Sequence, residues 1–196
     1  MSSEAESSDP LHALFRFHRR IRLSMRTFLR IAESSKAGVE PNQVEVRALT
    51  DFFTGPLIWH DIDEEVTLMP RLRRAPEPKF AKLLEEITEQ HQRMEEILEG
   101  ILPHLTDVAT GRVKANGALL VTEANALYEL LSEHLRLEEQ EIFPVARNVL
   151  SEEELGEMAV EMSTRLEGNK HKMPRVVPLG AEVSSKDGNT ASGEPA

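Results

Sequence analysis

Apolar residues recur at every third or fourth position along most of the chain, and no segment shows the strict alternation that is typical of a β-strand. The first run follows Asp9 and Pro10, a pair that suits the start of a helix, and it ends before Gly38 and Pro41. This pattern predicts a helix over about residues 10–36. Its apolar stripe contains Leu11, Leu14, His18, Ile21, Met25, Phe28 and Ala32.

Three more long helical runs follow the first. They cover about residues 42–74, the stretch from the proline-rich segment 75–79 to the turn at Gly111, and about residues 115–149. Within the second run, Gly55-Pro56 and Pro70 are expected to kink or interrupt the helix. Four long helices joined by short breaks predict an all-α chain folded as an up-down-up-down four-helix bundle.

A short fifth helix and a tail are expected after the bundle. Ser151 and Glu154 have the spacing of a capping box, which predicts a helix over about 152–167. The remaining residues contain no aromatic side chain and are rich in Gly, Ser and Pro, which is typical of disorder. The sequence thus predicts three parts: a bundle over 10–149, a short C-terminal helix within 150–167 and a disordered tail over 168–196.

Composition narrows the classes of function. The chain has 34 acidic and 23 basic residues and a formal charge of −11, which argues against a nucleic acid or an anionic membrane surface as its main partner. It has no cysteine, which excludes disulfides, thiol catalysis and thiolate-held zinc or iron–sulfur sites. The polar start does not look like a secretory signal, and no apolar run is long enough to cross a membrane. We therefore expect a cytoplasmic protein.

One motif occurs twice in the chain. The segments HDIDEEVTLMP, from His60, and HLRLEEQEIFP, from His134, both read H-x-x-x-E-E-x-x-x-x-P. The interval from His18 to His60 also nearly equals the interval from His91 to His134. The chain therefore has an internal repeat, and each half offers one histidine followed by a His-x-x-x-Glu pair.

This repeat predicts a buried metal site. Residues four apart share a helix face, so each His-x-x-x-Glu pair projects both side chains into the same space. Buried carboxylates need a counter-charge, and two metals bridged by two carboxylates would use this symmetric set better than one metal. Imidazole and carboxylate without thiolate suit iron, manganese or zinc, and we favour a pair of iron ions. The expected ligands are His18, His60, Glu64, His91, His134 and Glu138.

Other residues near the motif are assigned different roles. Glu65 and Glu139 lie about 100° further around their helices than the inward glutamates, so they are expected to support the site or face solvent. His12, His104 and His171 have no partner at matching spacing and are not expected to be ligands. A bundle without metal, in which the His–Glu pairs are only hydrogen-bonded, stays open as an alternative.

The segment HRRIR at His18, the two repeated motifs and the isolated His91 resemble the hemerythrin-like (HHE cation-binding) domain over about residues 10–149. The resemblance implies a four-helix bundle around a non-haem, oxo- or hydroxo-bridged di-iron centre. It also implies that the second-helix and fourth-helix carboxylates, Glu64 and Glu138, bridge the metals.

The chain departs from the oxygen-carrying members of that family at two positions. They have His-x-x-x-His on the third helix, whereas this chain has His91 followed by Glu95, and they have an aspartate where this chain has Glu139. Either Glu95 supplies a seventh ligand or one metal has a more open coordination sphere. Asp61, next to His60, is a further candidate ligand.

Two functions are compatible with such a site. One is the binding or reduction of a small ligand (dioxygen, hydrogen peroxide or nitric oxide), and a more open site would suit peroxide decomposition. The other is an iron-binding regulatory module that senses iron or oxygen without turnover, in which metal binding is coupled to the stability of the bundle.

Overall fold

The computed structural model describes residues 9–74 and 78–169, and within these ranges it contains helices and no strand. The prediction of an all-helical chain is confirmed for this part. The predicted fifth helix corresponds to α9 (Glu152–Asn169), whereas the segment 170–196 of the predicted disordered tail lies outside the described residues. No helix in the described ranges is both long and apolar enough to cross a membrane.

The first and third long helices are continuous, and the second and fourth are divided. The continuous ones are α2 (Pro10–Lys36) and α6 (Pro78–Ala109). The second consists of α3 (Gln43–Thr54), α4 (Pro56–Ile62), the π-helix η1 (Asp63–Leu68) and α5 (Met69–Leu72). The fourth consists of α7 (Gly117–Leu137), the π-helix η2 (Glu138–Ile142) and α8 (Phe143–Val149).

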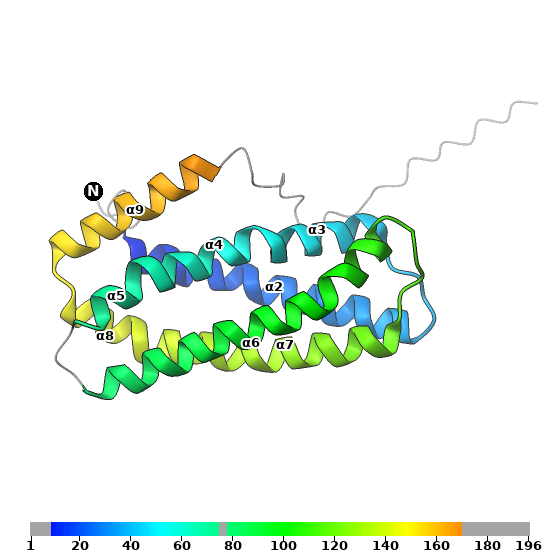
Figure 1. Cartoon of the computed structure of the whole chain (residues 1–196), viewed down its shortest axis with the longest axis horizontal. Helices are drawn as coiled ribbons and strands as arrows, with labels where there is room; N and C mark the ends of the chain where they lie inside the picture. Colours follow the sequence, from blue (N-terminus) through cyan, green and yellow to red (C-terminus); the bar gives the residue numbers. More distant parts are fainter. Residues whose placement is uncertain (1–8, 75–77, 170–196) are drawn as a thin grey trace, which may run out of the picture.

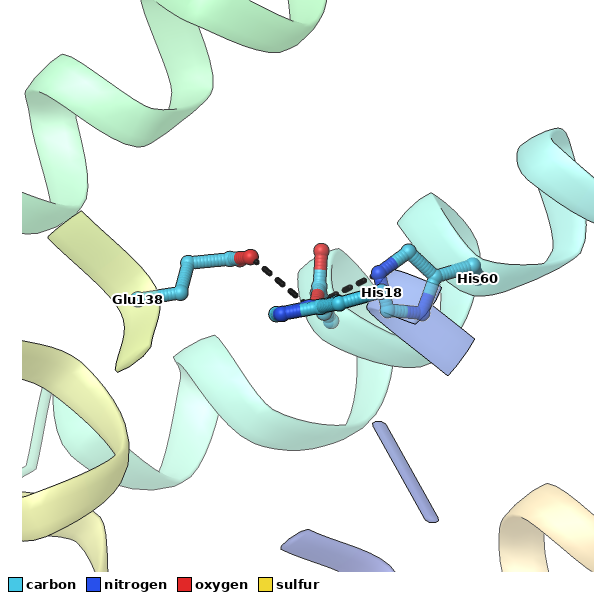
Figure 2. Close-up of side chains that lie close together, drawn as sticks. His18, His60 and Glu138 are labelled. Carbon is cyan, nitrogen blue, oxygen red and sulfur yellow. Dashed lines mark ion pairs between the residues drawn. The ribbon is translucent and has the colours of Figure 1, made fainter. Parts of the chain in front are cut away.

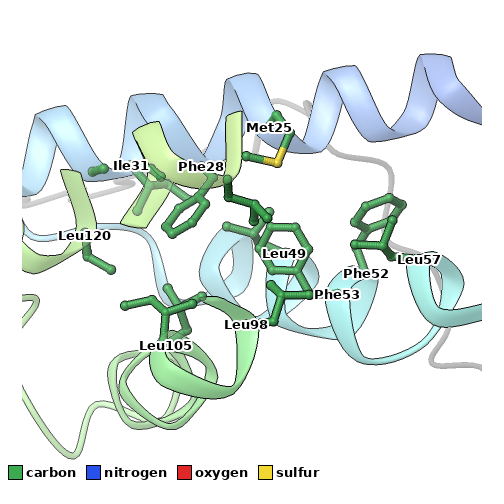
Figure 3. Packing of buried hydrophobic residues seen from close by; sticks show 14 of the residues in the cluster. Met25, Phe28, Ile31, Leu49, Phe52, Phe53, Leu57, Leu98, Leu105 and Leu120 are labelled. Carbon is green, nitrogen blue, oxygen red and sulfur yellow. The ribbon is translucent and has the colours of Figure 1, made fainter. Parts of the chain in front are cut away.

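The long helices pack lengthwise against one another (Figure 1). α2 packs against α7, α3 packs against α6, and α6 also packs against α7. Phe28 of α2, Leu49 and Phe53 of α3, Leu105 of α6 and Leu120 of α7 are all completely buried where these helices meet (Figure 3). Burial of such side chains is the main favourable contribution to folding.

Two apolar clusters lie along the length of the molecule, with a layer of polar residues between them. On α2, for example, Leu14 belongs to one cluster and Ile21 to the other, and His18 lies between them. The same order holds on the other long helices, at His60, His91 and His134. The alternation of apolar and polar turns therefore brings the four histidines to one depth.

α9 lies across one end of the molecule, near α4 in Figure 1, and contacts α2 and η1. The buried guanidinium of Arg71 pairs with Glu157 and Glu161 of α9. Arg165 of α9 in turn pairs with Asp63, the first residue of η1. Charge pairs therefore connect α9 to the segment that carries Glu64.

Candidate metal centre

The structure brings all six predicted ligands together, each from a different helical element. They are His18 of α2, His60 of α4, Glu64 of η1, His91 of α6, His134 of α7 and Glu138 of η2. Every one is buried, and the most exposed has only 6% of its surface accessible. Six ionisable side chains in one buried layer are unusual unless charges are balanced there.

The six residues form two overlapping groups of four. One contains His18 and His60, the other contains His91 and His134, and both contain Glu64 and Glu138. Within each group the candidate ligand atoms lie within 4.8 Å of one another. The two shared carboxylates are thus placed between two pairs of imidazoles.

Individual distances show how Glu64 is shared. Its Oε1 lies 3.2 Å from Nε2 of His60 and 4.0 Å from Nε2 of His18, whereas its Oε2 lies 3.5 Å from Nε2 of His91. One oxygen of Glu64 therefore faces each group.

Glu138 also contacts histidines of both groups. Its Oε2 lies 3.2 Å from Nε2 of His18 and 3.5 Å from Nε2 of His134. In Figure 2, Glu138 and His60 approach His18 from opposite sides.

Most of the inward-facing atoms have no hydrogen-bond partner within residues 9–74 and 78–169. These buried atoms are Nε2 of His18, His60 and His91, both carboxylate oxygens of Glu64, and Oε2 of Glu138. Leaving so many polar atoms unsatisfied costs free energy, because each has lost its hydration. Imidazole nitrogens and carboxylate oxygens are also the donors that iron, manganese and zinc accept. The residues therefore fit a metal site.

Three of the four candidate histidine ligands are oriented by a hydrogen bond at Nδ1, whereas their Nε2 faces the centre. Nδ1 of His18 lies 2.8 Å from Glu139, and Nδ1 of His91 lies 2.9 Å from Glu65. An ionised carboxylate only accepts hydrogen bonds, so Nδ1 carries a proton and Nε2 faces the centre, where its lone pair becomes available for metal once any proton on it is released. The supporting role expected for Glu65 and Glu139 matches these contacts.

The third orienting group was not predicted. Oε1 of Gln90 lies 3.1 Å from Nδ1 of His134, and both side chains are buried. Gln90 directly precedes His91, yet it has no counterpart in the repeated motif. Its only sequence signal is its polarity next to a candidate ligand.

The shape of the backbone follows from the repeated proline. Proline has no N–H and its ring clashes with the carbonyl four residues earlier, so an α-helix cannot continue unchanged before Pro70 or Pro144. The chain widens into a π-helix at each place, where the N–H of Met69 bonds the carbonyl of Glu64 and that of Phe143 bonds the carbonyl of Glu138. The inward glutamates thus lie at the first widened turn in both halves.

In the absence of metal, the electrostatics of the centre favour protons on two histidines. Burial alone would lower the pKa of His18, but its contacts with Glu138 and Glu64 raise it to about 10. Burial likewise opposes the charge on His91, but Glu64 and Glu65 raise its pKa to about 11. Burial and the nearby Glu138 raise the pKa of Glu64 to about 7. Protons thus supply part of the positive charge that these carboxylates need.

The other two histidines are held neutral. Burial lowers the pKa of His60 well below its ordinary value and lowers that of His134 to about 4. The positive charges on the neighbouring histidines act in the same direction for both. Neutral imidazole is the form that binds metal.

Asp61 and Glu95 are not part of either group of four. They line a cavity of about 470 Å³ beside His91, together with Glu65. Glu95 is exposed on α6, whereas burial raises the pKa of Asp61 well above its ordinary value. Both therefore lie beside the centre in this structure.

Two other histidines also lie outside the groups. His12 is half-buried on α2, and Nε2 of His104 accepts a hydrogen bond from the backbone of Asn116. His171 lies outside the described residues.

The comparison with protein families agrees with this geometry. The model of the hemerythrin HHE cation-binding domain matches residues 9–146, which is more than half of the chain. No curated protein and no solved structure was found to match. The chain belongs to the hemerythrin HHE cation-binding domain family.

Proposed function

We propose that this protein is a non-haem di-iron protein that binds or reduces a small ligand (dioxygen, hydrogen peroxide or nitric oxide). The observation that carries the proposal is the pair of overlapping candidate ligand groups, in which most of the inward atoms are buried and lack hydrogen-bond partners among the described residues. Two groups that share two carboxylates favour two metals, and the donor set together with the family favours iron over manganese or zinc. The predicted four-helix bundle would be the scaffold.

The residues of the chain would hold and protect the metals. His18 and His60 would bind one iron, His91 and His134 the other, and the carboxylates Glu64 and Glu138 would bridge them. When bound, iron would supply the capacity to exchange electrons with the small ligand. The apolar clusters on both sides of the polar layer would keep bulk water away.

A second function, iron or oxygen sensing without turnover, is favoured by the position of α9. Asp63 precedes Glu64 in η1 and pairs with Arg165 of α9. Metal binding at Glu64 would therefore reach α9 through adjacent backbone. For either function we expect a cytoplasmic protein whose main partner is a small molecule, and neither nucleic acid nor membrane.

Metal analysis of the purified full chain, read with its visible absorption spectrum, tests the metal site. We expect two iron ions per chain and the charge-transfer bands of a bridged pair. His134→Ala is expected to lose iron, whereas His12→Ala, a histidine outside the ligand groups, is expected to keep it. Absence of bound metal after anaerobic loading with ferrous iron would contradict the proposal.

The two functions differ in turnover. A small-ligand redox protein should consume peroxide or react with oxygen or nitric oxide at a rate that scales with iron content. A sensor should show negligible consumption and a large metal-dependent change in the hydrogen exchange of α9.

A further inference from the structure

A cavity of about 600 Å³ lies between α2, α4 and α9, on the outer side of His60. Its walls are mainly apolar and include Leu14, Phe17, Trp59, Val160, Met162 and Leu166. This volume is typical of sites that bind small organic molecules, which are mostly apolar with a few placed polar groups. The cavity is much larger than a diatomic ligand or peroxide requires.

The charges along this cavity are unequal. Its two acidic residues are already paired, Asp9 with Arg147 and Asp63 with Arg165. Arg20 also lines the cavity, and no described acidic side chain pairs with it. The cavity therefore has one uncompensated charge among its described residues, and that charge is positive.

The position of Arg20 suits an anionic ligand. Its guanidinium lies over the ring of Phe17, 4.9 Å from the ring centroid, and 5.9 Å from that of Phe52. Partial burial lowers the pKa of Arg20, which reflects lost hydration of its charge. A planar guanidinium that is held on an aromatic face is well placed to bind a carboxylate through two hydrogen bonds.

The cavity also reaches the metal centre. The ring of His60 stacks on Phe17, with centroids 4.7 Å apart, and lines the cavity. Its Nδ1 has no hydrogen-bond partner among the described residues, in contrast to the other three candidate histidine ligands. An occupant of the cavity would therefore cover the one candidate ligand ring whose Nδ1 has no orienting partner in the described part of the chain.

We propose that this cavity binds a small amphipathic carboxylate, with its carboxylate on Arg20 and an apolar body of up to about ten carbon atoms along Phe17 and Trp59. The site goes beyond the proposed function and does not depend on bound metal. Its ligand is distinct in size and chemistry from the small ligands of the metal centre.

Titration calorimetry of the full chain with sodium octanoate, and with 1-octanol as its uncharged match, tests this site. We expect saturable octanoate binding that weakens at least about tenfold in Arg20→Gln, while octanol binding stays unchanged. Arg19→Gln, an exposed arginine on the same helix, is the matched control and should bind octanoate as the unmodified chain does. Trp59 is the only tryptophan, so its emission should change along the same isotherm.

A second variant, Ala159→Phe, fills the cavity from α9 and should abolish octanoate binding while Arg20 remains. No saturable binding, equal affinity in Arg20→Gln, binding that survives Ala159→Phe, or unchanged Trp59 emission would each overturn the proposal. Binding of a peptide of residues 170–196 in place of octanoate would also overturn it and assign the cavity to the chain's own C-terminal segment.

Discussion

Oε1 of Glu139 lies 2.8 Å from Nδ1 of His18, and the other oxygen of the same carboxylate accepts a hydrogen bond from Arg22. Glu65 has the same relationship to His91 and also accepts a hydrogen bond from Thr88. In each E-E pair the first glutamate thus faces the centre, and the second orients a histidine on a neighbouring long helix. The two acids of the motif have different roles because consecutive residues of a helix point in different directions around its axis.

Removal of the Glu139 carboxylate should weaken metal binding without unfolding the protein. In Glu139→Ala, Nδ1 of His18 loses its acceptor, so the ring is no longer fixed with Nε2 toward the centre. Groups that orient a ligand typically contribute about 10- to 100-fold in metal affinity. Competition with a chelator measures this loss, and circular dichroism checks that helix content is unchanged.

The matched control is Glu133→Ala on the same long helix. Glu133 is exposed and pairs with Arg136 only at the surface, so its loss should not change metal affinity. Equal chelator sensitivity of Glu139→Ala and the unmodified chain would contradict the orienting role.

Substitution of Glu95 should leave the metal content unchanged. Glu95 replaces the second histidine of the oxygen carriers, but its side chain is exposed and belongs to neither ligand group. Glu95→Ala is therefore expected to bind as much iron as the unmodified chain, whereas Glu64→Ala is expected to bind less. Elemental analysis of both variants checks this, and loss of one metal in Glu95→Ala would instead make Glu95 a ligand.

The layer of candidate ligands could be predicted from the sequence because it depends on helical spacing and on the internal repeat. His60 and Glu64 share a face at any point of a regular helix, and the internal repeat places the second half opposite the first. The family resemblance, which the comparison confirms, depended on the same residues.

Other features depend on contacts between helices that spacing does not encode. Gln90 reaches His134 only because α6 and α7 pack at a particular rotation about their axes. The π-helices directly precede Pro70 and Pro144, whereas the sequence predicted only a kink or interruption at Pro70 and nothing at Pro144. The cavity beside His60 requires the docking of α9, which buries Leu155 and Met158 in an apolar cluster and places Glu157 and Glu161 beside Arg71.

Replacement of Gly117 by a larger residue is expected to destabilise the folded chain. A Cβ at this position would overlap backbone atoms of Ser35 and Lys36, where the start of α7 meets the end of α2. Backbone cannot move aside as a flexible side chain can, so Gly117→Ala should lower the free energy of unfolding by about 2 to 3 kcal/mol. Urea denaturation at equal metal loading measures the change.

Gly100 provides the opposite case within α6. A Cβ there would meet no atom within 4 Å, and alanine favours helix more than glycine does. Gly100→Ala should therefore raise the free energy of unfolding by about 0.5 to 1 kcal/mol. Effects of the same sign in both variants would contradict the close approach of α2 and α7.

The metal-free protein should lose stability as the pH rises above 7. His18 and His91 have pKa values of about 10 and about 11 in the folded chain, above the ordinary value of 6.5. The stability they contribute is complete below pH 6.5 and is lost as the pH rises toward those values. Glu64, whose pKa is raised to about 7, adds to the loss only up to about pH 8, and His134, whose pKa is lowered to about 4, has finished titrating well below this range.

Urea denaturation of chelator-treated protein between pH 7 and 9 measures this loss. Each of the two histidines contributes a slope of up to about 1.4 kcal/mol per pH unit, so His91→Gln should reduce the slope by about half. Metal-loaded protein should show a much flatter profile, because a coordinated Nε2 carries no proton at any of these pH values. Constant or rising stability of the metal-free chain over this range would show that the two histidines are not protonated beside Glu64 and Glu138.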